Sequence, residues 1–179
     1  KVTSTVQRVV LPPEMVKTAE TLEKALDNLL DEDDTWLDFT NQSTLYALLN
    51  RRSPVFVNQS PGLLSGDYSQ ECFIEQIEKQ KDDVPVALLP NSPMLLGYIL
   101  DGVQNSLRYY RVAEYIYNNY VPYGTAAGYA IWVRPERLEA MKLDAENSDE
   151  KEDGRLTLDA DGLRPVNCSI RNENGALVI

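Results

Sequence analysis

Histidine is absent from the 179 residues, and this absence excludes more chemistry than any other feature of the sequence. Without it the chain has no Ser-His-Asp or Cys-His catalysis, lacks the usual proton shuttle at neutral pH and lacks the commonest zinc ligand. Cysteine is scarce as well, because Cys72 and Cys168 lie far apart and lack metal-binding spacing. The two thiols fit either buried apolar positions or one disulfide bond formed in an oxidising compartment.

Basic residues are also few, since 17 Lys and Arg stand against 28 Asp and Glu and give a formal net charge of -11. A chain of this charge repels phosphate backbones and anionic lipids, so we do not expect nucleic acid as a partner. No apolar run approaches the roughly 20 residues that a membrane-spanning helix needs. Because the sequence starts at Lys1, we expect a soluble domain that is part of a longer protein.

Phosphate-binding and metal-binding motifs are missing or weak. No GxGxxG follows the first expected strand, and no GxxxxGK[ST] is present. The acidic triplets 31–33 and 159–161 match the DxD pattern that holds a divalent metal in some nucleotide-sugar glycosyltransferases. In so acidic a chain such triplets arise by chance, and we interpret both as solvated turns. We therefore predict no metal, no cofactor and no catalytic residue within this chain.

What the sequence does contain is an alternation of strand-like and helix-like segments. Strands are expected at 35–40, 54–57, 84–89 and 128–133, and helices at 18–30, 43–49, 70–81 and 107–117. A turn is expected from Pro122 to Gly124. This alternation is typical of βαβ units, so the predicted fold class is α/β. We expect a small Rossmann-like, mostly parallel sheet of at least four strands with flanking helices, plus a short β-rich tail.

The change of composition after residue 135 predicts three parts. Residues 1–135 form the α/β domain, and residues 136–155 form an acidic linker or loop that is too polar to pack. Residues 156–179 alternate in polarity and contain an Asn174-Gly175 turn. They are expected to form a short β tail that packs on the domain or makes a hairpin.

Candidate ligand-binding residues follow the predicted strands, because open α/β sheets bind ligands outside the carboxyl ends of parallel strands. These residues are Asp38, Asn41, Asn58 and Asn91, and Arg51, which lies just before the strand expected at 54–57, is added for its guanidinium. The acid and the asparagines also suit simple turn formation. Arg51, next to Arg52, suits either bidentate binding of a phosphate or carboxylate, or pairing with the surplus surface acids.

A cluster of tyrosines between residues 109 and 120 suits either a sugar-stacking platform or core packing. Tyr110 falls on the apolar face of the predicted helix with Ala113 and Tyr117. We therefore expect Tyr110 and Tyr117 to pack in the core, while Tyr109 and Tyr120 fit either role.

Two stretches together carry a family resemblance. TWLDFTN at 35–41 with LYALLNRRSP at 45–54, and RYY to EYIYNNY at 108–120, are similar to an extracytoplasmic segment of certain bacterial proteins. These are polytopic membrane proteins related to dolichyl-phosphate-mannose–protein mannosyltransferases, and the segment is their C-terminal one. The resemblance covers residues 30 to 135. It implies sugar transfer from a polyprenyl-phosphate donor, with catalytic carboxylates in a membrane-embedded part that this chain lacks.

The leading hypothesis is thus an extracytoplasmic accessory or acceptor-recognition domain at a bacterial membrane, not catalytic alone. Its implied partners are the membrane-embedded remainder of the same polypeptide and a glycan or protein acceptor. The alternative is a free-standing protein- or glycan-binding module. A third hypothesis, a hydrolase that uses carboxylates alone, requires two carboxylates facing each other across a pocket.

Overall fold

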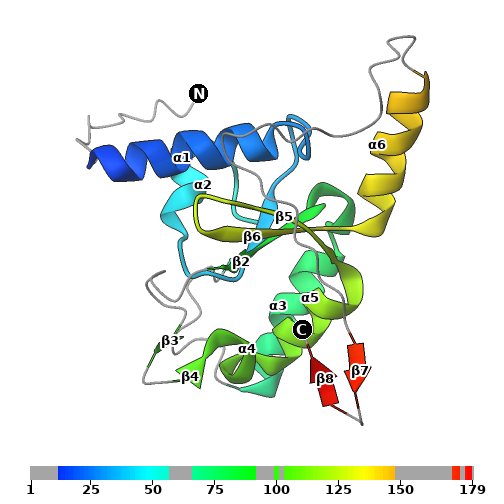
Figure 1. Cartoon of the computed structure of the whole chain (residues 1–179). Helices are drawn as coiled ribbons and strands as arrows, with labels where there is room; N and C mark the ends of the chain where they lie inside the picture. The colour runs from blue at the N-terminus through cyan, green and yellow to red at the C-terminus, as the bar shows by residue number, and fades with distance from the viewer. Residues whose placement is uncertain are drawn as a thin grey trace.

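Four strands form the central sheet, in the order β1-β2-β6-β5. The computed structural model describes residues 12–56, 66–91, 99–100, 103–147, 171–173 and 176–178. The sheet strands are β1 (Trp36–Asp38), β2 (Val86–Pro90), β5 (Val121–Ala126) and β6 (Tyr129–Val133). Figure 1 shows the sheet at the centre of the molecule, with helices above and below it.

The sheet is mixed and mostly antiparallel, which corrects the expectation of a mostly parallel sheet. Only the β1–β2 pair is parallel among its three strand pairs, whereas β2–β6 and β6–β5 are antiparallel. The α/β class is confirmed, but a Rossmann-like arrangement is not. A single parallel pair does not provide the reversal of strand order at which doubly wound sheets bind their ligands.

Two local features explain this difference. The expected strand at 54–57 is wrong, because its described residues Pro54, Val55 and Phe56 form a bend in which Phe56 is 94% exposed. The expected turn at 122–124 lies inside β5 instead, where the register shifts between Pro122 and Gly124. The turn that joins β5 to β6 consists of Ala127 and Gly128, both with positive φ, which forces an antiparallel hairpin.

Helices cover both faces of the sheet. Figure 1 places α1 (Pro13–Leu26) and α2 (Thr44–Leu48) on one face and α3 (Asp67–Glu78) and α5 (Tyr110–Asn119) on the other. The short elements η1 (Lys81–Asp83) and α4 (Asn105–Arg108) precede β2 and α5. Helix α1 starts before Thr18, which was the expected first residue, because Pro13 supplies a first-turn position that needs no N–H acceptor.

Alternate strand residues contribute to two separate cores. Trp36, Leu88 and Ile131 pack with α1, whereas Leu37 and Ala87 pack with α3 and α5. This period of two is what a sheet buried on both faces requires. The near-continuous apolar run of β2 is explained by the same arrangement, because each of its two faces meets a layer of helices.

Helix α6 (Pro135–Asn147) overlaps the expected linker at 136–155, and residues 148–155 are outside the described part. Two small hairpins complete the chain, β3–β4 (Ile99–Leu100 and Val103–Gln104) and β7–β8 (Arg171–Glu173 and Ala176–Val178). Strands β7 and β8 pair with each other and not with the four-stranded sheet. Among the described helices, none has the length and apolarity to cross a membrane.

Candidate functional site

Asp38 closes the turn at the carboxyl end of β1. Its carboxylate accepts hydrogen bonds from the backbone N–H of Thr40 at 2.8 Å, from the Thr40 hydroxyl at 2.6 Å and from the backbone N–H of Gln42 at 2.8 Å. An aspartate that binds the amides following it is a common way to fix a turn. The carboxylate is therefore occupied by the chain itself.

The surroundings of Asp38 are apolar enough to change its acidity. The residue is 7% exposed, and burial raises the pKa of its carboxyl, an effect that the hydrogen bonds from Thr40 and Gln42 offset only in part. Tyr46 completes the site: its hydroxyl accepts from the Asp38 N–H at 3.1 Å and donates to the Trp36 carbonyl at 2.8 Å. Burial, with the nearby Asp38 charge, raises the pKa of Tyr129 to about 12.

Two asparagines extend this polar cluster. Asn41 has a φ of 61°, a left-handed conformation that asparagine tolerates better than most residues. Its side-chain Nδ2 lies 3.5 Å from Oδ1 of buried Asn105, whose own Nδ2 donates to the Phe39 carbonyl at 3.1 Å. No sequence pattern pointed to Asn105, which is the first residue of the short helix α4. Because buried Asn105 donates to the Phe39 carbonyl, it ties α4 to the end of β1.

Asn91 lies at the same edge of the sheet as Asp38, because it follows β2 and β2 is parallel to β1. It is exposed, and its backbone N–H donates to the Gly128 carbonyl at 3.0 Å. Asn58 lies outside the described residues. The structure thus brings Asp38, Asn41 and Asn91 to one edge.

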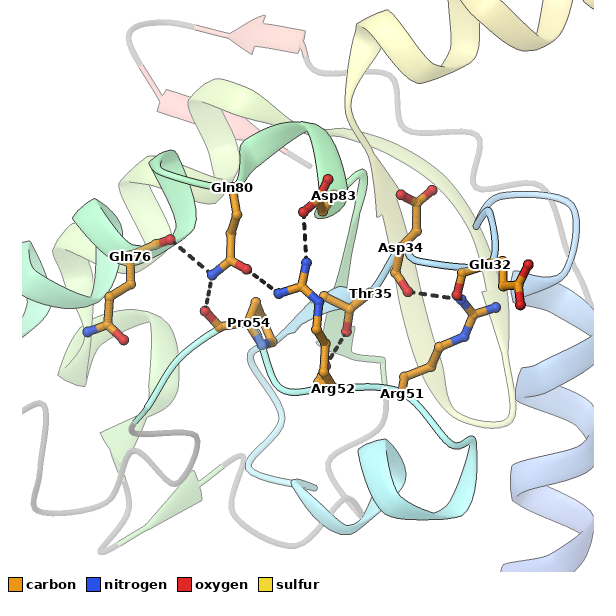
Figure 2. A network of polar contacts seen from close by, with 9 residues as sticks. All are labelled: Glu32, Asp34, Thr35, Arg51, Arg52, Pro54, Gln76, Gln80 and Asp83. Carbon is orange, nitrogen blue, oxygen red and sulfur yellow. Dashed lines mark hydrogen bonds and ion pairs between the residues drawn. The ribbon is translucent and has the colours of Figure 1, made fainter. Parts of the chain in front are cut away.

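Arg51 lies at the opposite edge, at the amino end of β1, because α2 returns the chain across the sheet. Figure 2 shows its guanidinium over the acidic loop that follows α1. Nη1 donates to the carbonyls of Asp31 at 2.5 Å, Glu32 at 2.7 Å and Asp34 at 3.0 Å. Its partners are thus the backbone oxygens of the acidic run, and the separation from Asp38 means that the two do not form one site.

Arg52 binds a second set of groups beside it. Its guanidinium forms an ion pair with Asp83 at 2.8 Å and a hydrogen bond with Gln80, while its carbonyl accepts from the Thr35 hydroxyl at 2.6 Å. Gln80 in turn donates to the carbonyls of Pro54 and Gln76, as Figure 2 shows. These contacts join residues 52–54 to the turn after α3, to η1 and to the residue before β1, which gives the network a structural role.

A third polar cluster surrounds Arg134, which follows β6 and is 9% exposed. Its Nε donates to the Val84 carbonyl at 3.3 Å, its Nη2 donates to the Tyr115 hydroxyl at 2.6 Å, and its guanidinium carbon lies 4.6 Å from the ring centre of Tyr120. The Tyr115 hydroxyl donates to Glu78. Burial, followed by this hydrogen bond, raises the pKa of Tyr115 to about 12. Sequence analysis missed Arg134.

The tyrosines are distributed differently from what we expected. Tyr109 and Tyr120 are 1% and 2% exposed and belong to the core, whereas Tyr110 and Tyr117 are 47% and 52% exposed. The expectation that Tyr110 and Tyr117 pack in the core is therefore wrong. The ring of Tyr117 instead contacts Trp132, with ring centres 5.5 Å apart.

The exposed tyrosines border a shallow groove along α5, which we call the α5 groove. It has a volume of about 480 Å³ and is lined by Ser106, Tyr110, Ala113, Glu114, Tyr117 and Asn118. Aromatic rings, a carboxylate, an amide and a hydroxyl therefore converge on one exposed surface. Such a combination offers both apolar faces for stacking and polar groups that orient a ligand.

The two buried tyrosines allow a matched test of the core. The Tyr120 hydroxyl donates to the Val84 carbonyl at 3.0 Å, whereas the buried Tyr109 hydroxyl has no partner among the described residues. We expect Tyr120→Phe to lower the free energy of unfolding by about 1 kcal/mol and Tyr109→Phe to leave it unchanged or raise it. Urea denaturation of both variants measures the difference. Equal losses in the two variants would contradict this assignment.

Among the residues that the structure describes, no group of three acidic, cysteine or histidine side chains is placed to hold a metal ion. Cys72 is half-buried on α3, and Cys168 lies outside the described part. Comparisons with protein-family models, with curated proteins and with solved structures found no match for this chain. The resemblance to the mannosyltransferase-related membrane proteins accordingly stays a prediction.

Proposed function

We propose that this chain is a recognition domain that binds a glycan in the α5 groove. The observation that supports this most is the pair of half-exposed tyrosines, Tyr110 and Tyr117, on the same groove as Glu114 and Asn118. The C–H faces of a sugar ring stack on aromatic rings, while its hydroxyls need hydrogen-bonding side chains beside them. Trp132 adds a further aromatic ring against Tyr117.

As a binding site, the α5 groove is preferred to the candidate residues Asp38, Asn41 and Arg51 for a physical reason. Asp38 and Asn41 make hydrogen bonds that fix the turn after β1, and Arg51 binds carbonyl oxygens of its own chain. A ligand at those groups has to replace hydrogen bonds that hold the fold. Tyr110, Glu114, Tyr117 and Asn118 are exposed on the α5 groove. The hydroxyl of Tyr110 donates to Asp67 on α3, so a ligand reaches these side chains without disturbing the sheet.

The parent protein that we propose is a glycosyltransferase-like membrane protein, with this domain on the extracytoplasmic face of a bacterial membrane. The support is the resemblance, because one of its two stretches is residues 108–120, which include both groove tyrosines. In this proposal the domain is not catalytic alone. It presents an acceptor glycan to the membrane-embedded remainder of the same polypeptide. The alternative, a free-standing binding module, shares the groove but lacks that partner.

Glycan binding is tested with an oligosaccharide array followed by calorimetric titration of the strongest binder. Tyr117→Ala and Tyr110→Ala are each expected to weaken binding about tenfold, the loss of roughly 1.4 kcal/mol that one stacked ring contributes. Tyr68→Ala is the matched control, since Tyr68 is 78% exposed on α3 and does not line the groove. Its affinity should equal that of the unmodified chain.

Two results would count against the proposal. The absence of any glycan ligand on the array, or equal binding by the Tyr117 and Tyr68 variants, would remove the glycan function. A coding sequence that extends upstream without transmembrane segments would remove the membrane-protein part and leave the free-standing module.

A further inference from the structure

A second groove lies at the edge of the sheet opposite Asp38, and we call it the Arg134 groove. Its volume is about 340 Å³, and its walls come from the end of α3, from η1, from the end of α5 and from the first turns of α6. The residues that line it include Lys81, Pro85, Asn119 and Arg134. It is separate from the α5 groove, and the inference below does not depend on the proposed glycan function.

The guanidinium of Arg134 has one terminal nitrogen, Nη1, without an acceptor in the described part of the chain. A buried cation is normally paired with a hydrogen-bonded carboxylate, because burial without one is costly. Glu78, the carboxylate paired with it among the described residues, lies 3.8 Å from Nη2, beyond hydrogen-bond distance, and accepts a hydrogen bond from Tyr115. Arg134 is 9% exposed and lines the groove, and its Nη1 has no acceptor among the described residues. A strong donor is thus left for a bound group.

Two further features add positive potential at this place. Helix α6 starts at Pro135, directly after Arg134, so the amino end of its dipole points to the same region. Lys81 is exposed on the groove and has no ion-pair partner in the described part of the chain. Both features favour an anion near Nη1 of Arg134.

Three acids limit the charge of that anion. Glu78, Asp82 and Glu136 also line the groove, and each repels an additional negative charge. Arg137, the third cation of the lining, is paired with Asp31 and Asp34 and does not offset this repulsion in full. A doubly charged phosphate meets this repulsion twice, whereas a carboxylate meets it once and matches the fork of a guanidinium. We propose that the Arg134 groove binds a small molecule through a single carboxylate, which accepts a hydrogen bond from Nη1 of Arg134.

The test is an NMR titration of the whole chain with sodium acetate, sodium glucuronate or phosphate at constant ionic strength set by chloride. The signals to follow are the Arg134 Nε–H and the backbone N–H of Glu136. Acetate and glucuronate are expected to shift both signals saturably, and phosphate to bind more weakly. An absence of saturable shifts, or tighter binding of phosphate than of either carboxylate, would overturn the proposal.

Charge variants separate a binding site from a purely structural cluster. Lys81→Met should weaken glucuronate binding about threefold, and Glu136→Gln should strengthen it about threefold, because each changes one exposed charge near the ligand. Lys79→Met is the matched control: this exposed lysine follows α3 and does not line the groove. A structural role for Arg134 does not predict tighter binding in Glu136→Gln, so unchanged affinity in that variant would count against the site.

Discussion

Replacing Leu88 with alanine is expected to lower the free energy of unfolding by about 3 kcal/mol. Leu88 is fully buried in β2, between β1 and β6, and packs in the core on the α1 side of the sheet. Truncation at this position removes apolar contacts and leaves a cavity that neighbouring strands on both sides cannot fill. Urea denaturation followed by circular dichroism gives the loss.

Leu107→Ala is the control for this change, because it deletes the same atoms at a residue that is 70% exposed. Its expected effect is within about 0.5 kcal/mol of zero. Similar losses in the two variants would contradict the burial of Leu88 in the core.

Replacing Asp38 with alanine is expected to cost about 3 kcal/mol, because three donors lose their acceptor at once. They are the N–H and hydroxyl of Thr40 and the N–H of Gln42, in a part of the chain that is largely buried. Asp33→Ala is the matched control, since Asp33 is an exposed acid in the loop before β1. Chemical denaturation at neutral pH should show little change for Asp33→Ala.

The same carboxyl should make stability depend on pH with a defined sign. Burial raises the pKa of Asp38 in the folded state above the unfolded value of about 3.9. The folded state then binds the proton more tightly than the unfolded state. The stability that this carboxyl contributes is therefore complete at a pH below the unfolded pKa and is lost as the pH rises through the folded pKa. The stability difference between the unmodified chain and Asp38→Asn should therefore fall over this window. A difference that grows with pH would show that the hydrogen bonds outweigh burial.

Sequence analysis correctly predicted β1, β2 and β6, the strands whose residues face a core on each side of the sheet. Leu88 and Ile131 lie in apolar runs, which a sheet covered on both faces requires, and Leu37 lies in a short stretch of residues with high strand propensity. Strand β5 was missed because Pro122 and Gly124 are typical of turns. In the structure these two residues flank the register shift of an edge strand, which is a position that tolerates both.

The tyrosines show why part of the candidate site could not be predicted. Two helical stripes overlap in this stretch, one through Tyr109, Val112 and Ile116 and the other through Tyr110 and Tyr117. Both have helical spacing, and tyrosine is suited to burial and to exposure alike. The chain also leaves regular helix at Tyr109, where φ is -115° and ψ is 52°, so one period does not run from α4 into α5.

The positions of Arg51 and Arg134 depended on chain direction. Arg51 was chosen for its guanidinium, just before the strand expected at 54–57, and the short helix α2 returns the chain to the amino end of β1, away from Asp38. Arg134 was missed because its burial comes from Tyr115, Tyr120 and Val84, which are distant in sequence. Local patterns carry no information on such contacts.

The strand pairs of the sheet differ in the length of chain that connects their two strands, and the Ala127-Gly128 turn is the short connection. Strands β5 and β6 meet across two residues, whereas β1 and β2 meet after a connection that passes through α2, α3 and η1. Closing a longer loop loses more conformational entropy. The parallel edge of the sheet therefore carries the larger closure cost. Changes that loosen the chain between Asp38 and Val86 act on that edge and leave the hairpin's own closure unaffected.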